Sequence, residues 1–153
     1  MMGAIPEGTW FAVPLRNGGY AVGVVSRTTA RGGIVLAYFL PRAWENPPSL
    51  KEVGSFRPDS ATRVLRIGDL GLVQGLWPTI GWDPTWRRAD WPAPAFIRKD
   101  DLSGRAWRVE YSDDDANIVV SEAPIEFGTP LERDAVLGAG AAEIVLTKAL
   151  SAG

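Results

Sequence analysis

Carboxylates are the side chains of this 153-residue chain that could do acid–base or metal chemistry, because histidine and cysteine are both absent. The run Asp113–Asp115 supplies the kind of oxygen ligand that calcium and magnesium prefer. Its spacing is not that of a calcium-binding loop, so a solvated hairpin turn is the favoured interpretation. Asp83, Asp90, Asp100 and Asp101 could form a general acid–base pair, but nothing in their spacing brings them together.

The missing residue types disfavour most enzyme mechanisms. Without histidine or cysteine there is no imidazole base, no thiol nucleophile, no disulfide and none of the commonest zinc ligands. Only three lysines are present, and Gly68–Gly71 lacks the lysine that follows the glycines of a phosphate-binding loop. We therefore predict a protein that is not an enzyme and has no catalytic residue, no metal and no cofactor.

Four of the seven tryptophans lie between Trp77 and Trp91. The prolines and glycine among them rule out a continuous helix or a central strand, so this segment is expected to be an ordered loop. Trp10, Trp77 and Trp107 lie in strand-like contexts and are expected to be buried. Whether the other tryptophans of the segment pin it to the core or stay exposed for a partner is left open by the sequence.

The second part of this segment has the composition of a protein-interaction hot spot, in which tryptophan and arginine are enriched. The candidate partner-binding residues are Trp82, Trp86, Arg87, Arg88, Asp90 and Trp91.

The charge distribution argues against nucleic acid and membranes as partners. The net charge is −2, and the half from residue 77 onwards has thirteen acidic and eight basic residues, against five and eight before it. Phosphate binding normally needs a basic face, and the longest apolar run, residues 34–40, is far shorter than the roughly 20 residues of a membrane helix. Residues 1–6 lack the features of a secretory signal, so a cytoplasmic location is expected.

The elements that would position these residues are mainly strands within one domain, residues 1–153. The turn residues Asn17–Gly19 predict a hairpin between two strands rich in β-branched and aromatic residues. A short helical turn is expected near residues 50–53. The predicted strands cover residues 9–15, 20–27, 34–40, 62–67, 95–98, 105–112 and 117–121.

The C-terminal stretch has helix signals. Thr129–Glu132 combines a capping residue, a proline and a glutamate, which predicts the start of a short helix. Gly138 and Gly140 would interrupt it, and a second helix is predicted over residues 141–150. The predicted fold is mainly β with a minor helical part: a small, strongly bent antiparallel sheet or SH3-like barrel with a C-terminal helix.

Several segments resemble the immunity 26 family of bacterial polymorphic toxin systems, some of whose members carry a phosphotriesterase label. The matching segments are Gly8–Leu15, Gly19–Val25, Ile67–Asp69, Gly75–Gly81 and Pro94–Phe96. They are patterns of glycine, proline and aromatic residues, so they specify a fold better than a chemistry. The residues expected to form this structural motif are Pro14, Gly19, Tyr20, Gly23, Gly68, Asp69, Gly75, Trp77, Pro78, Gly81, Pro94 and Phe96.

The resemblance implies a protein that neutralises a cognate protein toxin by binding and occluding it, with no oligomeric state implied. On this hypothesis Trp82, Trp86 and Trp91 anchor the partner, Arg87 and Arg88 bind its carboxylates, and the acidic second half steers a basic toxin. Two alternatives stay open. A phosphotriesterase-like hydrolase would be expected to use metal-binding histidines, which the chain lacks, and an SH3-like module would bind a proline-rich peptide in an aromatic groove.

Overall fold

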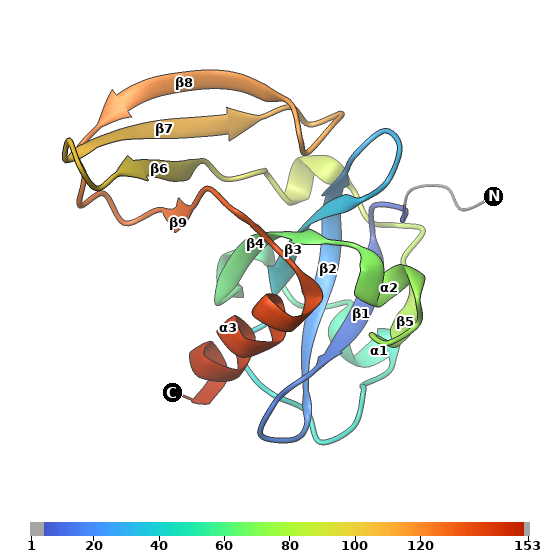
Figure 1. Ribbon diagram of the computed structural model, residues 1–153. Helices are drawn as coiled ribbons and strands as arrows, with labels where there is room; N and C mark the ends of the chain where they lie inside the picture. Colours follow the sequence, from blue (N-terminus) through green and yellow to red (C-terminus); the bar gives the residue numbers. More distant parts are fainter. Residues whose placement is uncertain (1–4, 152–153) are drawn as a thin grey trace.

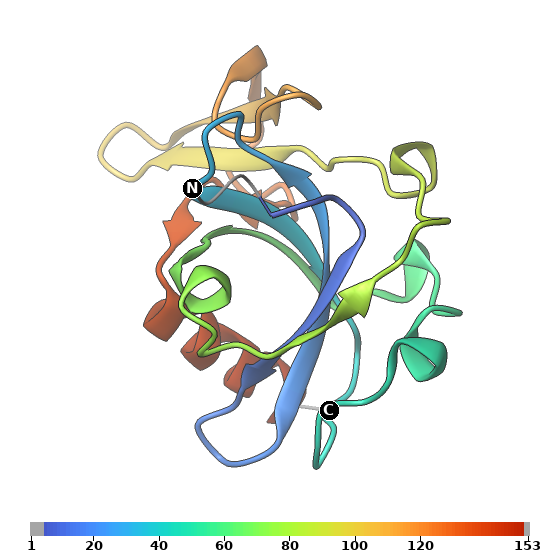
Figure 2. The same ribbon diagram turned by 90° about the vertical axis from the view of Figure 1, so that its right-hand side faces the viewer.

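The larger of two sheets in the computed structural model, which describes residues 5–151, contains six strands in the order β10-β4-β3-β2-β1-β5. Figure 2 shows that this sheet curls strongly around its own axis. Its strands are β1 (Thr9–Pro14), β2 (Tyr20–Thr28), β3 (Ile34–Phe39), β4 (Arg63–Gly68), β5 (Thr79–Trp82) and β10 (Val136–Leu137).

The predicted hairpin between β1 and β2 is present. Gly18 and Gly19 in its turn have φ of 93° and 75°, values that L-residues with a side chain rarely adopt. Antiparallel pairing continues from β2 to β3 and from β3 to β4, so β1 to β4 form a meander.

The second sheet has the order β8-β7-β6-β9 and projects beyond the first, as Figure 1 shows. Its strands are β6 (Phe96–Asp100), β7 (Arg105–Tyr111), β8 (Val119–Ile125) and β9 (Glu132–Arg133). Phe96 at the start of β6 packs with Leu36 of β3 and with Ala116, and this small cluster joins the two sheets.

The helices are short except for the last. They are α1 (Leu50–Val53), α2 (Leu70–Val73), α3 (Ala139–Ser151) and two 3-10 turns, η1 (Pro58–Ser60) and η2 (Arg88–Asp90). A capping box starts α1, with Ser49 and Glu52 exchanging side-chain and backbone hydrogen bonds. Within residues 5–151, no helix is long and apolar enough to cross a membrane.

Apolar side chains fill both sides of the curled sheet. Inside the curl, Phe11, Phe39 and Trp77 pack with Leu146 from α3. On the outer face, a second cluster contains Trp10, Val24, Tyr38, Leu40 and Trp91. β2 and β3 are therefore buried on both faces, which is why the sequence of residues 34–40 is apolar without alternation.

Several motif residues have clear structural roles. A Cβ on Gly23 would lie 2.7 Å from the ring of Phe39, so only glycine lets the two strands approach so closely. Asp69 accepts a hydrogen bond of 2.8 Å from the backbone N–H of Gly33. Trp77 is stacked parallel to Phe11 and donates from Nε1 to Glu143 of α3 over 3.0 Å.

The structure selects between the two predicted forms and corrects two details of the predicted fold. Of the two predicted forms, the strongly bent sheet is present, and no closed barrel forms among the described residues. Both sheets are mixed instead of antiparallel, because β10 pairs parallel to β4 and β9 pairs parallel to β6. The helix predicted to start at Thr129 is absent: the side chain of Glu132 binds Arg63 and its backbone region pairs with β6. The last predicted helix is present as α3.

Candidate partner-binding surface

The segment from Trp77 to Trp91 is an ordered connection made of β5, a loop and η2. Residues near the N-terminus hold it in place. The N–H of Asp83 donates to the carbonyl of Gly8 over 3.1 Å, and Trp82 Nε1 donates to the carbonyl of Glu7 over 3.1 Å. Arg88 binds the carboxylate of Glu7 through two nitrogens. The loop is therefore a fixed platform.

Its tryptophans differ in exposure. Trp77 is fully buried, as predicted, and so is Trp10 of β1. Trp91 is only 6% exposed and meets the rings of Trp10 and Tyr38 edge-on. The indole of Trp91, predicted as a partner anchor, therefore belongs to the core beneath the loop and is not part of the exposed surface.

Trp107 also differs from its prediction. It is half-buried, because β7 extends past the first sheet and leaves this indole uncovered by the core. The guanidinium groups of Arg98 and Arg105 lie 5.0 and 5.7 Å from its ring.

Trp82 and Trp86 remain accessible. Trp82 is 56% exposed. Trp86 is half-buried and stacked on Trp91, with ring centroids 6.4 Å apart and planes 22° apart. The Nε1–H of Trp86 has no acceptor among the described residues, although buried donors normally have one. Exposed indoles held by hydrogen bonds and stacking lose little conformational entropy when a partner covers them.

A cleft of about 370 Å³ is lined by Trp86 and Trp91, and Trp82 lies outside its lining. Arg87 lines this cleft, and 74% of its side chain is exposed. Its ion pair with Asp90 is long, at 3.4 Å. An exposed pair of this kind is weak, so Arg87 is free to exchange Asp90 for a carboxylate of a partner. The cleft is lined by Gly54, Phe56, Arg57, Pro58, Asp83, Thr85, Trp86, Arg87, Asp90 and Trp91.

Arg88 faces the other side of η2 and has a different environment. It binds Glu7 and, over 3.0 Å, Asp114. These hydrogen bonds, that of Glu7 first, raise the pKa of Arg88 above its ordinary value. Arg88 therefore fastens the loop to its neighbours, and of the two adjacent arginines Arg87 has the freer guanidinium.

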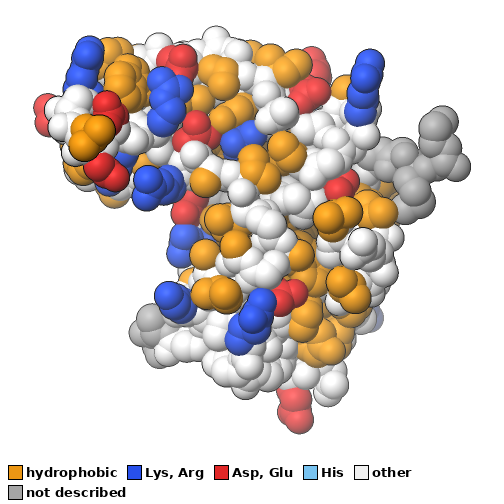
Figure 3. Space-filling model, viewed as in Figure 1, with side chains coloured by type: hydrophobic (Ala, Val, Ile, Leu, Met, Phe, Trp, Pro, Cys, Tyr) orange, Lys and Arg blue, Asp and Glu red, His pale blue; other side chains and the backbone are white. Residues whose placement is uncertain are grey.

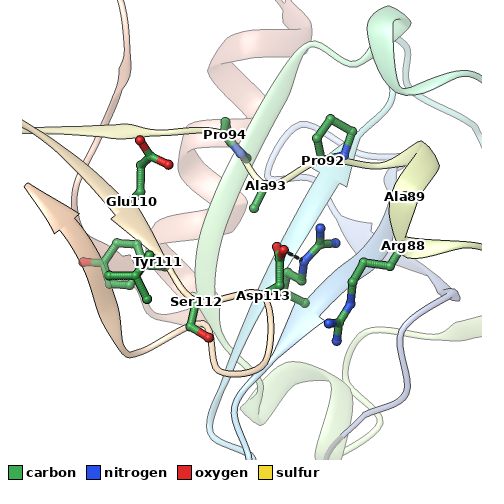
Figure 4. A pocket seen from close by; sticks show the side chains of 11 residues that line it. Arg88, Ala89, Pro92, Ala93, Pro94, Glu110, Tyr111, Ser112 and Asp113 are labelled. Atoms are coloured by element: carbon green, nitrogen blue, oxygen red, sulfur yellow. Dashed lines mark hydrogen bonds and ion pairs between the residues drawn. The ribbon is translucent and has the colours of Figure 1, made fainter.

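A second cleft of about 740 Å³ opens on that side, between η2 and the second sheet (Figure 4). Arg27 of β2 forms part of its floor and is only 3% exposed. Its Nε donates to Asp113 over 2.8 Å and its Nη1 donates to the carbonyl of Trp91. Pro92, Ala93 and Pro94 form one wall, and Glu110 to Asp113 form the other.

The acidic side chains do not converge on a reaction centre. No group of three or more aspartates or glutamates that could hold a metal ion occurs in residues 5–151. Asp83 accepts hydrogen bonds from Thr85, and Asp90 pairs with Arg87. Asp100 accepts a hydrogen bond from Ser103, which lowers the pKa of Asp100.

Asp113–Asp115 is more than a solvated turn, because the three carboxylates bind different parts of the molecule. Asp113 binds Arg27 and Asp114 binds Arg88. Asp115 accepts hydrogen bonds from the backbone N–H groups of Ala30 and Asn117.

Ion pairs across the two halves of the chain use part of the acidic surplus found in the sequence. Four arginines from the first half each bind an acidic residue of the second half, which leaves less of that charge for steering a partner. The pairs are Arg16–Glu143, Arg27–Asp113, Arg63–Glu132 and Arg66–Asp134.

A strongly curled β sheet with an exposed, rigidly held aromatic surface defines this chain as a β-rich protein with a candidate binding face. Comparison with protein families identifies it further. The model of the family Immunity protein 26 matches residues 6–108, and the chain belongs to that family. Searches of curated proteins and of solved structures give no match. The family match ends within β7, and all of the loop from Trp77 to Trp91 lies inside it.

Proposed function

We propose that this immunity protein binds a cognate bacterial toxin in the cytoplasm and neutralises it by occlusion, using the surface formed by Trp82, Trp86 and Arg87. The observation that carries the proposal is the exposure of Trp82: the residue is 56% exposed, yet its indole is held by a hydrogen bond to the carbonyl of Glu7. Large aromatic side chains of this kind dominate binding energy where they enter a partner's pocket. Family membership supports the immunity class.

The chemistry of the surface indicates what a toxin would offer it. Trp82 provides apolar area for a pocket or a flat apolar patch. Arg87 presents a planar group that binds a carboxylate through two parallel hydrogen bonds. A backbone carbonyl of the toxin could accept from Trp86 Nε1 after a small movement of the ring, since this donor has no other acceptor among the described residues.

Co-expression with the product of the gene immediately upstream tests this proposal. We expect the wild-type chain to restore growth of cells that express this product, and Trp82→Ala and Arg87→Ala each to weaken its binding by about 2 kcal/mol, roughly 30-fold. Leu102→Ala is the matched control, because Leu102 is fully exposed on the β6–β7 turn. Unchanged affinity of both variants, with the thermal unfolding midpoint preserved, would show that the toxin binds elsewhere.

The same cleft favours one alternative. Phe56, Trp86 and Trp91 line it together with Asp83 and Asp90, and aromatic grooves with nearby acids bind proline-rich peptides that carry arginine. A peptide such as Arg-Pro-Leu-Pro-Pro-Leu-Pro, titrated into the labelled protein, separates the two functions. Micromolar binding at this cleft, with no rescue of growth by the chain, would favour the peptide-binding module.

A further inference from the structure

β8 is an open edge of the second sheet. It pairs with β7 on one side, and no described strand pairs with it on the other. Every residue of β8 except Ile125 is exposed, and Figure 1 shows the strand at the outer margin of the projecting sheet. An edge strand presents backbone N–H and C=O groups to which an extended segment of another chain can add.

Pro124 limits where such pairing can occur. A proline within a strand is found where the missing N–H would face solvent, and N–H directions alternate along the strand. The N–H of Glu122, two residues earlier, therefore points to the open edge. The part of β8 before Pro124 is available for pairing, and the remainder is blocked.

Aliphatic side chains accompany this stretch. Ile118, Val119 and Val120 are 55%, 44% and 61% exposed. In the β7–β8 pairing, Glu110 is opposite Ser121 and Tyr111 is opposite Val119, so Val120 is the extra residue of a bulge. Val120 is also one of the residues that line the 740 Å³ cleft, together with Pro92–Pro94. Figure 3 shows hydrophobic side chains at the surface of this sheet among charged ones.

The charge of the same stretch indicates which chain would pair with it. Residues 109–132 contain seven acidic residues and no lysine or arginine. Arginines elsewhere bind several of these carboxylates, but Asp115 and Glu126 have no basic partner among the described residues. A second copy of the chain would bring two such acidic strands together, which is unfavourable, whereas a basic segment would find complementary charge.

We propose that β8 is a second recognition site, which adds an extended segment of the toxin with alternating aliphatic and basic side chains as a new strand at Val119–Ala123. Aliphatic side chains of that segment cover Ile118 and Val120 on the side of the cleft, and the basic ones, which alternate to the other face of the new strand, lie in the acidic surroundings of residues 109–132. The assignment of the segment to the toxin rests on the proposed function. The family match ends at residue 108, before β8 begins, so this site is not part of the matched family pattern.

A peptide probe tests the site without knowledge of the toxin. The probe is a ten-residue peptide of alternating valine and lysine, titrated into the ¹⁵N-labelled full chain. The control peptide has the same length and alternates valine and glutamate. We expect the lysine peptide to shift the amide resonances of Val119–Ala123 and of the cleft, with affinity about tenfold lower at 300 mM salt than at 50 mM. The glutamate peptide should bind at least about tenfold more weakly.

Two pairs of variants separate the backbone from the side-chain contribution. Val120→Lys should reduce affinity for the lysine peptide about tenfold, whereas Leu102→Lys, which adds the same charge at another exposed position, should not. Glu122→Pro should abolish strand addition because it removes the N–H at the open edge, and Glu122→Ala should keep it. Equal binding by Glu122→Pro and Glu122→Ala, or equal binding of the two peptides, would overturn the proposal.

Sedimentation of the free chain tests the competing occupant. A monomer at 100 μM is the expected result. A dimer that Val120→Lys dissociates would assign the edge to a second copy and overturn the proposal. If the Trp82 and Arg87 variants bound the toxin as tightly as the wild type, only the proposed function would be contradicted. The peptide titration tests β8 and does not depend on the surface of Trp82 and Arg87.

Discussion

Gly23 lies in β2 between two buried phenylalanine rings. A Cβ at this position would be 2.7 Å from Phe39 Cε1 and 3.0 Å from Phe11 Cζ, distances at which the rings must move. Both rings are completely buried and meet edge-on, so they have little room to do so. The glycine at this position therefore has a steric reason in the packing of the core.

Gly23→Ala should lower the free energy of unfolding by about 1–3 kcal/mol, the usual range for an overpacked core. Urea denaturation monitored by tryptophan fluorescence measures it. Gly128→Ala is the control, since Gly128 has no neighbour within 4 Å and no positive φ, and it should change stability by less than about 0.5 kcal/mol. Similar midpoints for the two variants would contradict the steric explanation.

The raised pKa of Tyr111 predicts that the stability of the protein depends on pH in the alkaline range. Burial, followed by its hydrogen bond to Asp134, raises the pKa of Tyr111 from 10.0 to about 12. The neutral phenol is therefore favoured in the folded protein, and its stabilisation is complete below pH 10 and is lost as the pH rises through 12. Tyr111→Phe should show a smaller loss of stability between pH 10 and 12 than the wild type, measured by urea denaturation at each pH.

Part of that loss should remain in the variant, because burial also raises the pKa of Tyr38. In the double variant Tyr38→Phe, Tyr111→Phe, the free energy of unfolding is expected to fall even less between pH 10 and 12. An identical decline for Tyr111→Phe and wild type would mean that the phenol is ionised equally in the folded and unfolded states.

At the scale of elements, two buried arginines, Arg27 and Arg66, attach the second sheet to the first. Arg66 of β4 is 4% exposed and binds Asp134 over 3.3 Å, the hydroxyl of Tyr111 over 3.0 Å and the carbonyl of Ala116 over 3.0 Å. Its guanidinium also lies 3.8 Å from the ring centre of Tyr111. Burial of these charges is tolerated because nearly every donor has an acceptor.

Arg66→Ala should cost about 3–5 kcal/mol, because it leaves Asp134 without its partner. Hydrogen exchange should accelerate in β7 and β8 more than in β2 and β3, since the second sheet loses its attachment first. Arg98→Ala breaks the half-exposed pair with Glu122 and should cost less than about 1 kcal/mol. Uniform acceleration across both sheets would mean that they unfold as one unit.

At the scale of the whole molecule, the family match and the folding unit differ. The match covers residues 6–108, but α3 contributes Ala142 and Leu146 to the core inside the curled sheet, and both are fully buried. Arg27 and Arg66 likewise take their acidic partners from beyond residue 108. The core of the matched segment is incomplete without the remainder.

A chain ending at residue 108 should therefore fail to fold cooperatively, whereas the full chain should show one sharp transition. Circular dichroism during heating and the dispersion of the ¹H–¹⁵N spectrum distinguish the two. The shortened chain would leave an apolar groove where α3 packs and two buried arginines without carboxylates. Native-like dispersion of its spectrum would show that residues 109–153 are dispensable for folding.

Local patterns predicted much of the fold because they depend on neighbours in sequence. The turn at Asn17–Gly19, the meander and the final helix follow from backbone preference and hydrophobic pattern. The prediction of a helix at Thr129 was wrong because the structure there depends on a residue far away in the sequence. Its capping glutamate, Glu132, is used by Arg63, a partner 69 residues away. No pattern within a short window contains that information.

The sequence by itself determined that the protein is mainly β, that it lacks imidazole and thiol chemistry, and that tryptophans concentrate in the segment from Trp77 to Trp91. Only the tertiary structure decided which of those aromatics a partner can reach. Trp91 and Trp82 stand in similar sequence surroundings, yet one packs against Trp10 and Tyr38 and the other remains exposed. Exposure depends on which strands pass beneath a side chain, and that is set by contacts between residues far apart in the chain.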